Sequence, residues 1–451
     1  MNVKKTKKIH FVGVSGIGIS GLAKICLAMG KEVSGSDLVE SVVTRGLKKD
    51  GAKIHIGRHL AKNLPPDASV LIYSNAIPPG NIERKKAAKL KIPQLSYPQA
   101  LGRLTLDKKL ICISGMHGKT TTTAMAALIL KEAGLDPTYI VGSYLPEIKG
   151  NAHLGKSDFM IIEADEFDRA MLNYYPDYIV LTNLEEDHLD TYKDLKDIKK
   201  AFKKYVKNLS RSGVLIANSD DKNIREVAKV CEAKKVYYGL KKGEYKAVDI
   251  SETEKETNFR VANADFILKV PGRHNIYNAL AAIALTAGLG VDSKVIKKSL
   301  AKFKGTWRRF QLLGNYKKSV PVISDYAHHP TEIKALLQAV KIKYPKKRIV
   351  ITFQPHQHNR TKNLFKEFTK AFGKADVLIM SEIFDVAGRE KKEDHDVSSK
   401  DLTDKIKLKE KYFAKNLKAT EALIKKKVKK GDVLLIVGAG DVYKLGEKFV
   451  N

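Results

Sequence analysis

Two different glycine-rich loops, each between a predicted strand and a predicted helix, constrain this chain more than any other feature. The second loop reads Gly-Met-His-Gly-Lys-Thr-Thr from Gly115 to Thr121 and follows an apolar strand at 109–114. In such loops backbone N–H groups surround a β-phosphate, the lysine reaches the β and γ oxygens, and a threonine hydroxyl can bind Mg²⁺. The loop is shorter than G-x-x-x-x-G-K-T, because Ile113 stands five residues before Gly118. Strand, loop and helix together still predict an ATP site.

The first loop follows an apolar strand at 9–14 and meets the G-x-G-x-x-G pattern with Gly16, Gly18 and Gly21. In nucleotide-binding units the first glycine makes a tight turn, the second lets the backbone approach a diphosphate, and the third lets the helix pack on the strand. Asp37 ends the next strand about 20 residues later, where such units contact a ribose or base. Two phosphate loops predict two phosphorylated ligands. This argues against an NAD-dependent oxidoreductase, the alternative that the first loop alone suggests.

The pattern of the whole chain predicts an α/β protein with mostly parallel sheets, because apolar β-type segments alternate with longer helical patterns. Its 451 residues suggest about three domains, which we expect at 1–106, 107–314 and 315–451. No apolar run reaches the ~18–20 residues of a membrane helix, so no membrane insertion is expected. The three cysteines form no C-x-x-C pair. We therefore expect neither a disulfide framework nor a zinc site, and a reducing cytoplasm fits.

The net charge of +32 is large and would suit a polyanionic partner such as nucleic acid. A nucleic-acid-binding protein needs a localised basic surface, whereas these lysines are scattered along the chain. We expect no nucleic-acid partner and keep a basic nucleic-acid-binding ATPase only as an alternative. The sequence leaves the oligomeric state and any function of the lysines open.

Acidic residues and a histidine follow two predicted strands of the second block. The strand at 159–162 ends in Glu163-Ala-Asp-Glu, and the strand at 178–181 leads to a Glu-Glu-Asp segment and His188. Because the carboxyl ends of parallel strands form the ligand crevice of α/β sheets, these groups should lie beside the phosphate loop. There a carboxylate and an imidazole could hold a Mg²⁺ ion that bridges the ATP phosphates.

These segments resemble the Mur ligases, the ATP-dependent amino-acid ligases of bacterial cell-wall synthesis. The resemblance rests on the segments 115–123, 163–166, 182–190 and 272–282. Further matching stretches, found in all three blocks, are 9–13, 33–37, 308–311, 325–332, 353–356 and 438–441. Within the family they are most similar to members that join L-alanine to UDP-N-acetylmuramate. The resemblance implies an N-terminal Rossmann-like domain for the UDP-sugar, a central P-loop ATPase domain, and a C-terminal Rossmann-like domain for the amino acid.

The resemblance also implies roles for residues at matching positions. The expected ATP contacts are Gly115, Met116, His117, Gly118, Lys119, Thr120, Thr121, Asn275 and Asn278. The expected Mg²⁺ ligands are Thr120, Glu163 and His188, and the expected catalytic residues are Lys119, His188 and Arg309. The UDP-sugar would contact Gly16, Gly18, Asp37, Ser74 and Asn75. The amino acid would contact Tyr326, His328, His356 and Arg360.

The implied reaction first phosphorylates a carboxylate, and an amine then attacks the mixed anhydride and displaces phosphate. A base must remove a proton from the amine, and the sequence does not choose between His188 and His328. Gln357 stands where the family usually has an arginine. Since glutamine offers no charge to a carboxylate, the choice of amino acid is open at this stage. The recycling ligase of the same family, which attaches a tripeptide to the same UDP-sugar, stays an alternative.

Overall fold

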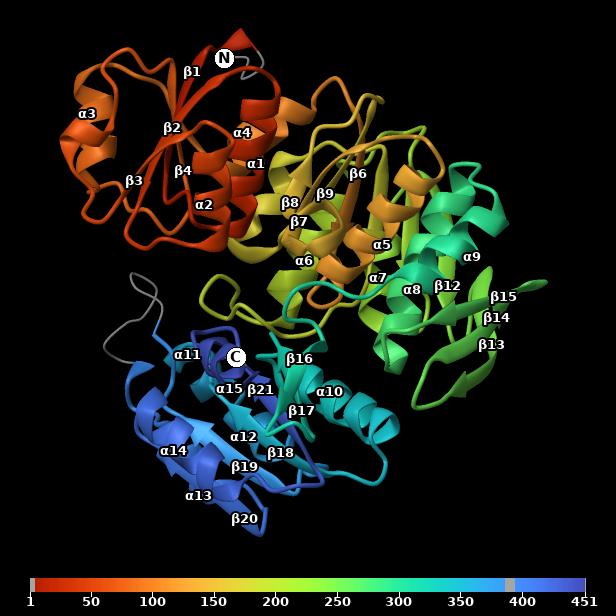
Figure 1. Cartoon of the computed structure of the whole chain (residues 1–451). Helices are drawn as coiled ribbons and strands as arrows, with labels where there is room; N and C mark the ends of the chain where they lie inside the picture. The colour runs from red at the N-terminus through yellow and green to blue at the C-terminus, as the bar shows by residue number, and fades with distance from the viewer. Residues whose placement is uncertain (1–4, 386–393, 451) are drawn as a thin grey trace.

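The computed structural model describes residues 5–385 and 394–450 and contains three α/β units, each built on its own sheet (Figure 1). The N-terminal unit has a five-stranded parallel sheet of order β3-β2-β1-β4-β5. Its strands are β1 (Lys8–Val12), β2 (Glu32–Asp37), β3 (Lys53–Ile56), β4 (Val70–Tyr73) and β5 (Gln94–Ser96). Its helices are α1 (Ile17–Ala28), α2 (Val42–Lys49), α3 (Ile82–Lys89) and α4 (Tyr97–Thr105).

The first strand and helix of this unit follow from local sequence. After Lys8 every residue of β1 is buried, as in a parallel strand covered on both faces. The strand ends at Val12 rather than at residue 14, because Gly13 turns the chain with φ +78°. The helix α1 ends at Ala28, and Gly30 just beyond it has a left-handed conformation that stops the helix.

The central unit is a ten-stranded sheet of order β15-β14-β13-β12-β11-β10-β6-β9-β7-β8. Its strands are β6 (Lys109–Ser114), β7 (Thr138–Leu145), β8 (Gly150–His153), β9 (Phe159–Glu163), β10 (Tyr178–Leu181), β11 (Val214–Asn218), β12 (Lys234–Gly239), β13 (Tyr245–Glu252), β14 (Thr257–Val261) and β15 (Ala264–Leu268). Its helices are α5 (Lys119–Glu132), α6 (Leu195–Val206), α7 (Lys222–Ala228), α8 (Arg273–Gly288) and α9 (Ser293–Lys302). The middle of the sheet is parallel as predicted, but both ends carry antiparallel strands that the sequence pattern did not predict.

The C-terminal unit is a six-stranded sheet of order β16-β17-β21-β18-β19-β20. Its strands are β16 (Gln311–Tyr316), β17 (Val320–Asp325), β18 (Arg348–Phe353), β19 (Val377–Ser381), β20 (Glu410–Ala414) and β21 (Asp432–Val437). Its helices are α10 (Pro330–Lys343), α11 (His358–Asn363), α12 (Phe365–Thr369), α13 (Ser399–Lys405), α14 (Leu417–Lys427) and α15 (Tyr443–Val450). The boundary expected at 314/315 would cut β16, which pairs with β17. We therefore propose a boundary before Gln311.

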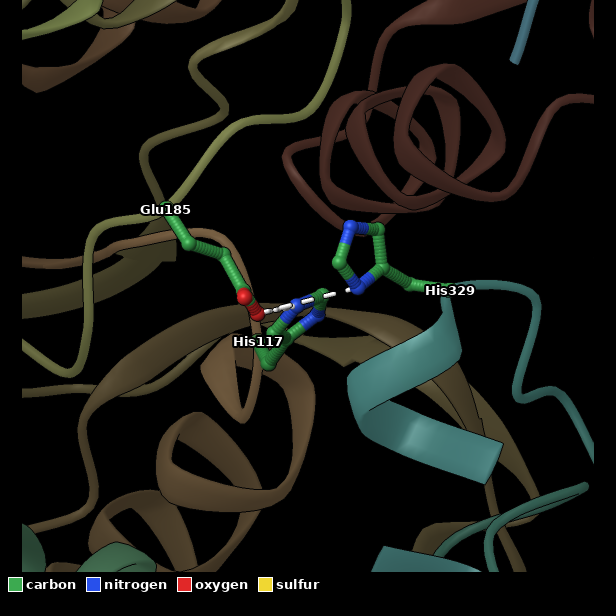
Figure 2. A group of neighbouring side chains, drawn as sticks. All are labelled: His117, Glu185 and His329. Carbon is green, nitrogen blue, oxygen red and sulfur yellow. Dashed lines mark hydrogen bonds and ion pairs between the residues drawn. The ribbon is translucent and has the colours of Figure 1, made fainter. Parts of the chain in front are cut away.

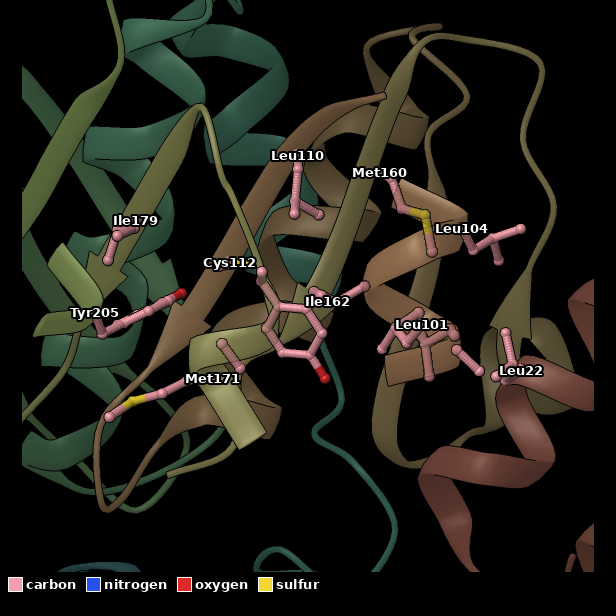
Figure 3. Packing of buried hydrophobic residues seen from close by; sticks show 14 of the residues in the cluster. Leu22, Leu101, Leu104, Leu110, Cys112, Met160, Ile162, Met171, Ile179 and Tyr205 are labelled. Carbon is pink, nitrogen blue, oxygen red and sulfur yellow. The ribbon is translucent and has the colours of Figure 1, made fainter. Parts of the chain in front are cut away.

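One continuous apolar core joins the N-terminal and central units (Figure 3). Leu22 of α1 and Leu101 of α4 belong to the same cluster as Met160 and Ile162 of β9. The third glycine of the first loop has its function here. A Cβ on Gly21 would overlap Ile140 of β7, so the missing side chain allows α1 to pack closely against the central unit. The prediction that Gly21 allows the helix to pack on the strand of its own unit was wrong.

A buried polar network stabilises the N-terminal unit. The carboxylate of Glu83, on α3, contacts Nε2 of His10 at 2.7 Å and Nδ1 of His59 at 2.8 Å, and accepts a 2.8 Å hydrogen bond from Ser36. Glu83 and His10 are fully buried. Burial alone would raise the pKa of Glu83, but these hydrogen bonds hold it below its ordinary value.

Within the described ranges, no helix combines the length and the apolar character needed to cross a membrane.

We expect Glu83→Ala to lower the free energy of unfolding by about 3 kcal/mol, because the substitution leaves the buried His10 and the partly buried His59 without their carboxylate. Because the folded-state pKa of Glu83 is depressed, its contribution is present above the pKa of the unfolded chain and is lost as pH falls through the folded pKa. Urea unfolding followed by circular dichroism measures both effects. Glu32→Ala, in β2, removes a mostly exposed carboxylate and should change little. Equal effects of the two substitutions would contradict this role for the network.

Candidate active site

The phosphate loop between β6 and α5 is held so closely by its neighbours that two positions accept only glycine. Gly115 and Gly118 have φ values of +129° and +83°. A Cβ on Gly115 would overlap the hydroxyl of Thr182, and one on Gly118 would overlap the side-chain amide of Asn278. The loop therefore lies directly against β10 on one side and α8 on the other.

Lys119 carries a buried charge at the start of α5. Its Nζ donates to the carbonyl of Gly115 at 2.6 Å and to the two carboxylate oxygens of Glu166 at 2.6 and 2.8 Å. Burial alone would lower the pKa of Lys119, but the charges of Glu166 and Asp165 more than offset burial and raise it. A triphosphate in this loop would compete with Glu166 for the ammonium.

The residues expected to hold Mg²⁺ form two neighbouring groups. Thr120 donates to Glu163 at 2.9 Å, as the prediction requires. His188 instead contacts Glu166, with 3.2 Å between Nε2 and Oε1, and its ligand atoms lie within 4.8 Å of those of Glu166 and Asp165. Burial raises the pKa of Glu163, and its hydrogen bonds only partly oppose this effect. The negative charge of this carboxylate is therefore incompletely compensated, and a bound cation would stabilise it.

A cavity of about 380 Å³ lies between the phosphate loop, α8 and the start of α10. It is lined by seven of the predicted residues: His117, Gly118, Thr120, Thr121, Asn275, Asn278 and Arg309. Gly115, Met116 and Lys119 do not line it, and the Met116 side chain lies in the core shared with the N-terminal unit. The size falls in the range of small-ligand sites, which is about 300–1,000 Å³.

His117 links the central and C-terminal units through a cluster with Glu185 and His329 (Figure 2). Its Nε2 lies 2.5 Å from Oε1 of Glu185, and its Nδ1 lies 3.1 Å from Oε1 of Glu332 on α10. Its ring is 4.9 Å from that of His329. Burial alone would lower the pKa of His117, but the two carboxylates raise it to about 10. The imidazole is therefore a cation at neutral pH.

Glu332 contacts several positive groups on the C-terminal side of the cavity. Besides His117, its carboxylate contacts Nη1 of Arg309 at 3.5 Å and accepts a 3.0 Å hydrogen bond from the backbone N–H of His328. Burial opposes ionisation, but the nearby cations hold the pKa of Glu332 well below its ordinary value. Glu332 was not among the residues expected in the site, although it lies in the matching segment 325–332 and its position in the first turn of α10 is a local signal.

The four residues expected on the amino-acid side lie next to one another. The rings of Tyr326 and His328 are 5.4 Å apart, and those of His328 and His356 are 6.1 Å apart. His356 also contacts Arg360: its Nδ1 lies 3.3 Å from Nη1 of the arginine. The ring of Phe384 stacks on His356 at 5.7 Å and closes this group on the other side.

Arg360 is almost fully buried, and besides His356 it contacts two further partners. Its Nε donates to Oδ1 of Asp187 at 3.0 Å, and Nη1 donates to Oε1 of Gln357 at 3.0 Å. The charge of Arg360 holds the pKa of Asp187 well below its ordinary value, although burial acts in the opposite direction. Gln357, the departure from the family pattern, therefore orients the arginine and does not supply a second charge. Asp187 and Glu166 were missing from the expected site residues, although both lie in the acidic strand-end segments.

The residues expected to contact the UDP-sugar follow the adjacent strands β1, β2 and β4. The strand order β2-β1-β4 places them at a topological switch point, the usual ligand crevice of such sheets. Asp37 accepts a 2.8 Å hydrogen bond from the backbone N–H of Ser15, so the acid holds the first loop in shape. A Cβ on Gly18 would press on the ring of Tyr97.

The remaining two of these residues follow β4. Ser74 lies against Gly13, where an added Cβ would meet it at 3.0 Å. Asn75 donates to Asp168 of the central unit at 2.9 Å. The crevice at β1 and β4 therefore faces the central unit.

Known families and proteins match this chain along its whole length. Residues 8–109 match the family described as "Mur ligase family, catalytic domain", residues 113–286 the "Mur ligase middle domain", and residues 308–440 the "Mur ligase, glutamate ligase domain". A UDP-N-acetylmuramate–L-alanine ligase of Caldanaerobacter subterraneus is 40% identical, over 100% of this chain and 99% of that protein. One from Clostridium kluyveri is 42% identical, over 99% and 98%.

Solved structures agree with these matches. The UDP-N-acetylmuramate–alanine ligase of Thermotoga maritima superimposes with a TM-score of 0.83 at 32% identity, over 98% of both chains. A murein peptide ligase of Psychrobacter arcticus shares the fold, with a TM-score of 0.76 at 24% identity over 98% of both chains. The resemblance and the three-part α/β architecture expected from the sequence are confirmed, and the chain belongs to the Mur ligase family.

Proposed function

We propose that this protein joins L-alanine to the carboxylate of UDP-N-acetylmuramate, with cleavage of ATP to ADP and phosphate, in peptidoglycan precursor synthesis. Full-length relatives with about 40% identity carry the name of this activity. The observation that carries the proposal is the cavity between the phosphate loop and α10, with the group of Tyr326, His328, His356 and Arg360 on the C-terminal side. A dehydrogenase, the alternative drawn from the first loop, needs no such second phosphate loop.

The proposed reaction has two steps. A carboxylate oxygen of the sugar attacks the γ-phosphorus, the bond between that phosphorus and ADP breaks, and an acyl phosphate forms. The amine then attacks the acyl carbon, and phosphate leaves with the electron pair of the C–O bond. Lys119 and Arg309 are two cations that can neutralise charge on the transferred phosphoryl group.

Thr120 and Glu163 fit a Mg²⁺ ion bound beside the phosphates. They offer a hydroxyl and a carboxylate oxygen 2.9 Å apart, and oxygen atoms are the ligands that Mg²⁺ prefers. His188, grouped with Asp165 and Glu166, contacts the carboxylate of Glu166. When bound, the ion would draw negative charge from the β and γ oxygens.

The amine must lose a proton, and the pKa values of the two candidate bases are shifted in opposite directions. Burial alone would lower the pKa of His188, but the charges of Asp187 and Glu166 raise it. Burial lowers the pKa of His328 to about 3, so its ring is neutral. Nδ1 of His328 lies 3.1 Å from the carbonyl oxygen of Tyr326, to which it can donate its hydrogen, and Nε2 is then the atom that accepts. A pKa of about 3 makes the His328 ring a weak base, so His188 and His328 both remain candidates for the proton acceptor.

Lys119→Ala should reduce ADP release by at least about 10²-fold, because it removes the cation that neutralises the transferred group. The assay contains purified full-length protein, Mg²⁺, ATP and UDP-N-acetylmuramate, with L-alanine, glycine, L-serine or a murein tripeptide as the amine. Lys131→Ala is the matched control, since Lys131 is exposed near the end of the same helix.

In the same assay we expect L-alanine to support the fastest release. Release that depends on the tripeptide and not on L-alanine would favour the recycling ligase. No difference between Lys119→Ala and the parent would contradict the phosphate-loop mechanism.

Arg360→Lys should raise KM for L-alanine about tenfold or more and leave KM for UDP-N-acetylmuramate nearly unchanged. Lysine keeps the charge but cannot make two hydrogen bonds to a carboxylate in one plane. Arg348→Lys is the control, because Arg348 makes a two-point contact with Asp432 in the same unit, at 2.9 and 3.0 Å. Equal changes in both variants would show that the effect is structural and not one of binding.

The His117 cluster predicts a pH-dependent contact between the central and C-terminal units. The folded-state pKa of about 10 lies above the ~6.5 of an unfolded histidine. The contribution to stability is therefore full below pH ~6.5 and is lost as pH rises toward about 10. Unfolding free energies should show the parent losing about 2 kcal/mol relative to His117→Gln over this interval. The control His55→Gln, at an exposed position, should show the same pH dependence of the unfolding free energy as the parent. A difference in unfolding free energy between the parent and His117→Gln that stays constant with pH would contradict the charge assignment.

A further inference from the structure

A second group of metal-ligating side chains lies in the C-terminal unit, apart from the site proposed for Mg²⁺. It consists of His358 at the start of α11, Asp385 after β19, and His395 before α13. Each offers one ligand atom, and these atoms all lie within 4.8 Å of one another. None of the three lines the ATP cavity or belongs to the group expected to contact the amino acid.

The His358 ring is oriented as metal-bound histidines usually are. Its Nδ1 lies 3.0 Å from the carbonyl oxygen of Val397. A carbonyl can only accept a hydrogen bond, so Nδ1 carries a hydrogen, and Nε2 is the nitrogen that is left to serve as a metal ligand. Nε2 points toward Asp385, with 3.1 Å to Oδ1. A backbone carbonyl that fixes the ring nitrogen not bound to the metal is a common outer partner of such sites.

The second imidazole distinguishes this group from an ordinary histidine–aspartate ion pair. The rings of His358 and His395 have centroids only 4.3 Å apart. Two protonated rings at this distance would repel each other, whereas two neutral rings and a carboxylate offer three donor atoms to a dication. Two imidazoles and one carboxylate are a ligand set for zinc and related divalent transition metals, while Mg²⁺ and Ca²⁺ prefer oxygen ligands.

The spacing also fits. With metal–ligand bonds of about 2.0–2.1 Å, the ligand atoms of a tetrahedral site lie about 3.3 Å apart. The distance between Nε2 of His358 and Oδ1 of Asp385 already has this value within a few tenths of an ångström. Asp385 and His395 are exposed, so rotation of their side chains can bring the remaining ligand atom closer.

We propose that His358, Asp385 and His395 form a binding site for Zn²⁺ or a similar divalent transition cation, with water in the fourth position. This site does not depend on the proposed ligase activity. No zinc site was expected from the sequence, because there is no pair of cysteines at a zinc-binding spacing and these three ligands form no short motif.

The position of the site indicates a structural role. Phe384, which precedes Asp385, stacks on His356 and accepts a 3.0 Å hydrogen bond from the backbone N–H of Gln357. A cation bound to Asp385 and His358 would tie this segment to α11. It would thereby hold Phe384 against the group expected to contact the amino acid.

The test is zinc binding by the full-length protein after treatment with a chelator. We expect the double variant His358→Ala/His395→Ala to bind one equivalent of Zn²⁺ less than the parent, by elemental analysis after gel filtration. The Zn²⁺-dependent rise in its unfolding temperature should also be lost. His153→Ala is the matched control. His153 makes a partly exposed ion pair with Asp136 at 2.7 Å, a pair that belongs to none of the metal-ligating groups found among the described residues, and this variant should bind like the parent.

A second measurement separates loss of binding from loss of folding. Co²⁺ bound in place of Zn²⁺ should give visible absorption bands typical of a four-coordinate nitrogen and oxygen site in the parent. Asp385→Asn, a change of an exposed side chain, should weaken these bands while leaving the circular dichroism spectrum intact. The proposal is overturned if the double variant binds as many equivalents as the parent, or if Asp385→Asn and the parent give the same Co²⁺ titration.

Discussion

The buried ammonium of Lys119 is the charge around which the active site is arranged. A charge taken out of water needs partners, and here they are the carbonyl of Gly115 and the carboxylate of Glu166. Glu166 in turn contacts His188. The carboxylate of Glu163, at the same strand end, accepts a hydrogen bond from the hydroxyl of Thr120. The two loop glycines make this arrangement possible because they let the chain approach β10 and α8. A triphosphate would replace Glu166 as the partner of the ammonium.

The three units are joined in two different ways. The N-terminal and central units share one apolar core, in which α1 and α4 pack against the central sheet (Figure 3). The contacts between the central and C-terminal units include ion pairs, such as His117 with Glu332 and Asp187 with Arg360. Ionic contacts between units separate more readily than a common core. This difference favours a mechanism in which the C-terminal unit closes over the acyl phosphate and excludes water.

Local sequence was enough to predict the elements that carry the loops, because a strand, a glycine turn and a helix start are each decided by neighbouring residues. Seven of the residues that line the cavity beside the phosphate loop were also among the expected ones, since the family motifs contain them. The partners of the charged residues were not. Glu332 is 215 positions from His117 in the sequence, and the role of Gly21 depends on β7 of another unit. Contacts between units are decided by packing, for which a single sequence carries no periodic signal.

The most direct test of the central claim follows the oxygen atoms of the sugar carboxylate. UDP-N-acetylmuramate labelled with ¹⁸O in that carboxylate would be incubated with the full-length protein, Mg²⁺, ATP and L-alanine, and the released phosphate examined by mass spectrometry. If the carboxylate is phosphorylated before the amide forms, each released phosphate carries one labelled oxygen from the sugar. Unlabelled phosphate together with formation of the amide product would contradict the acyl phosphate and the role assigned to the phosphate loop.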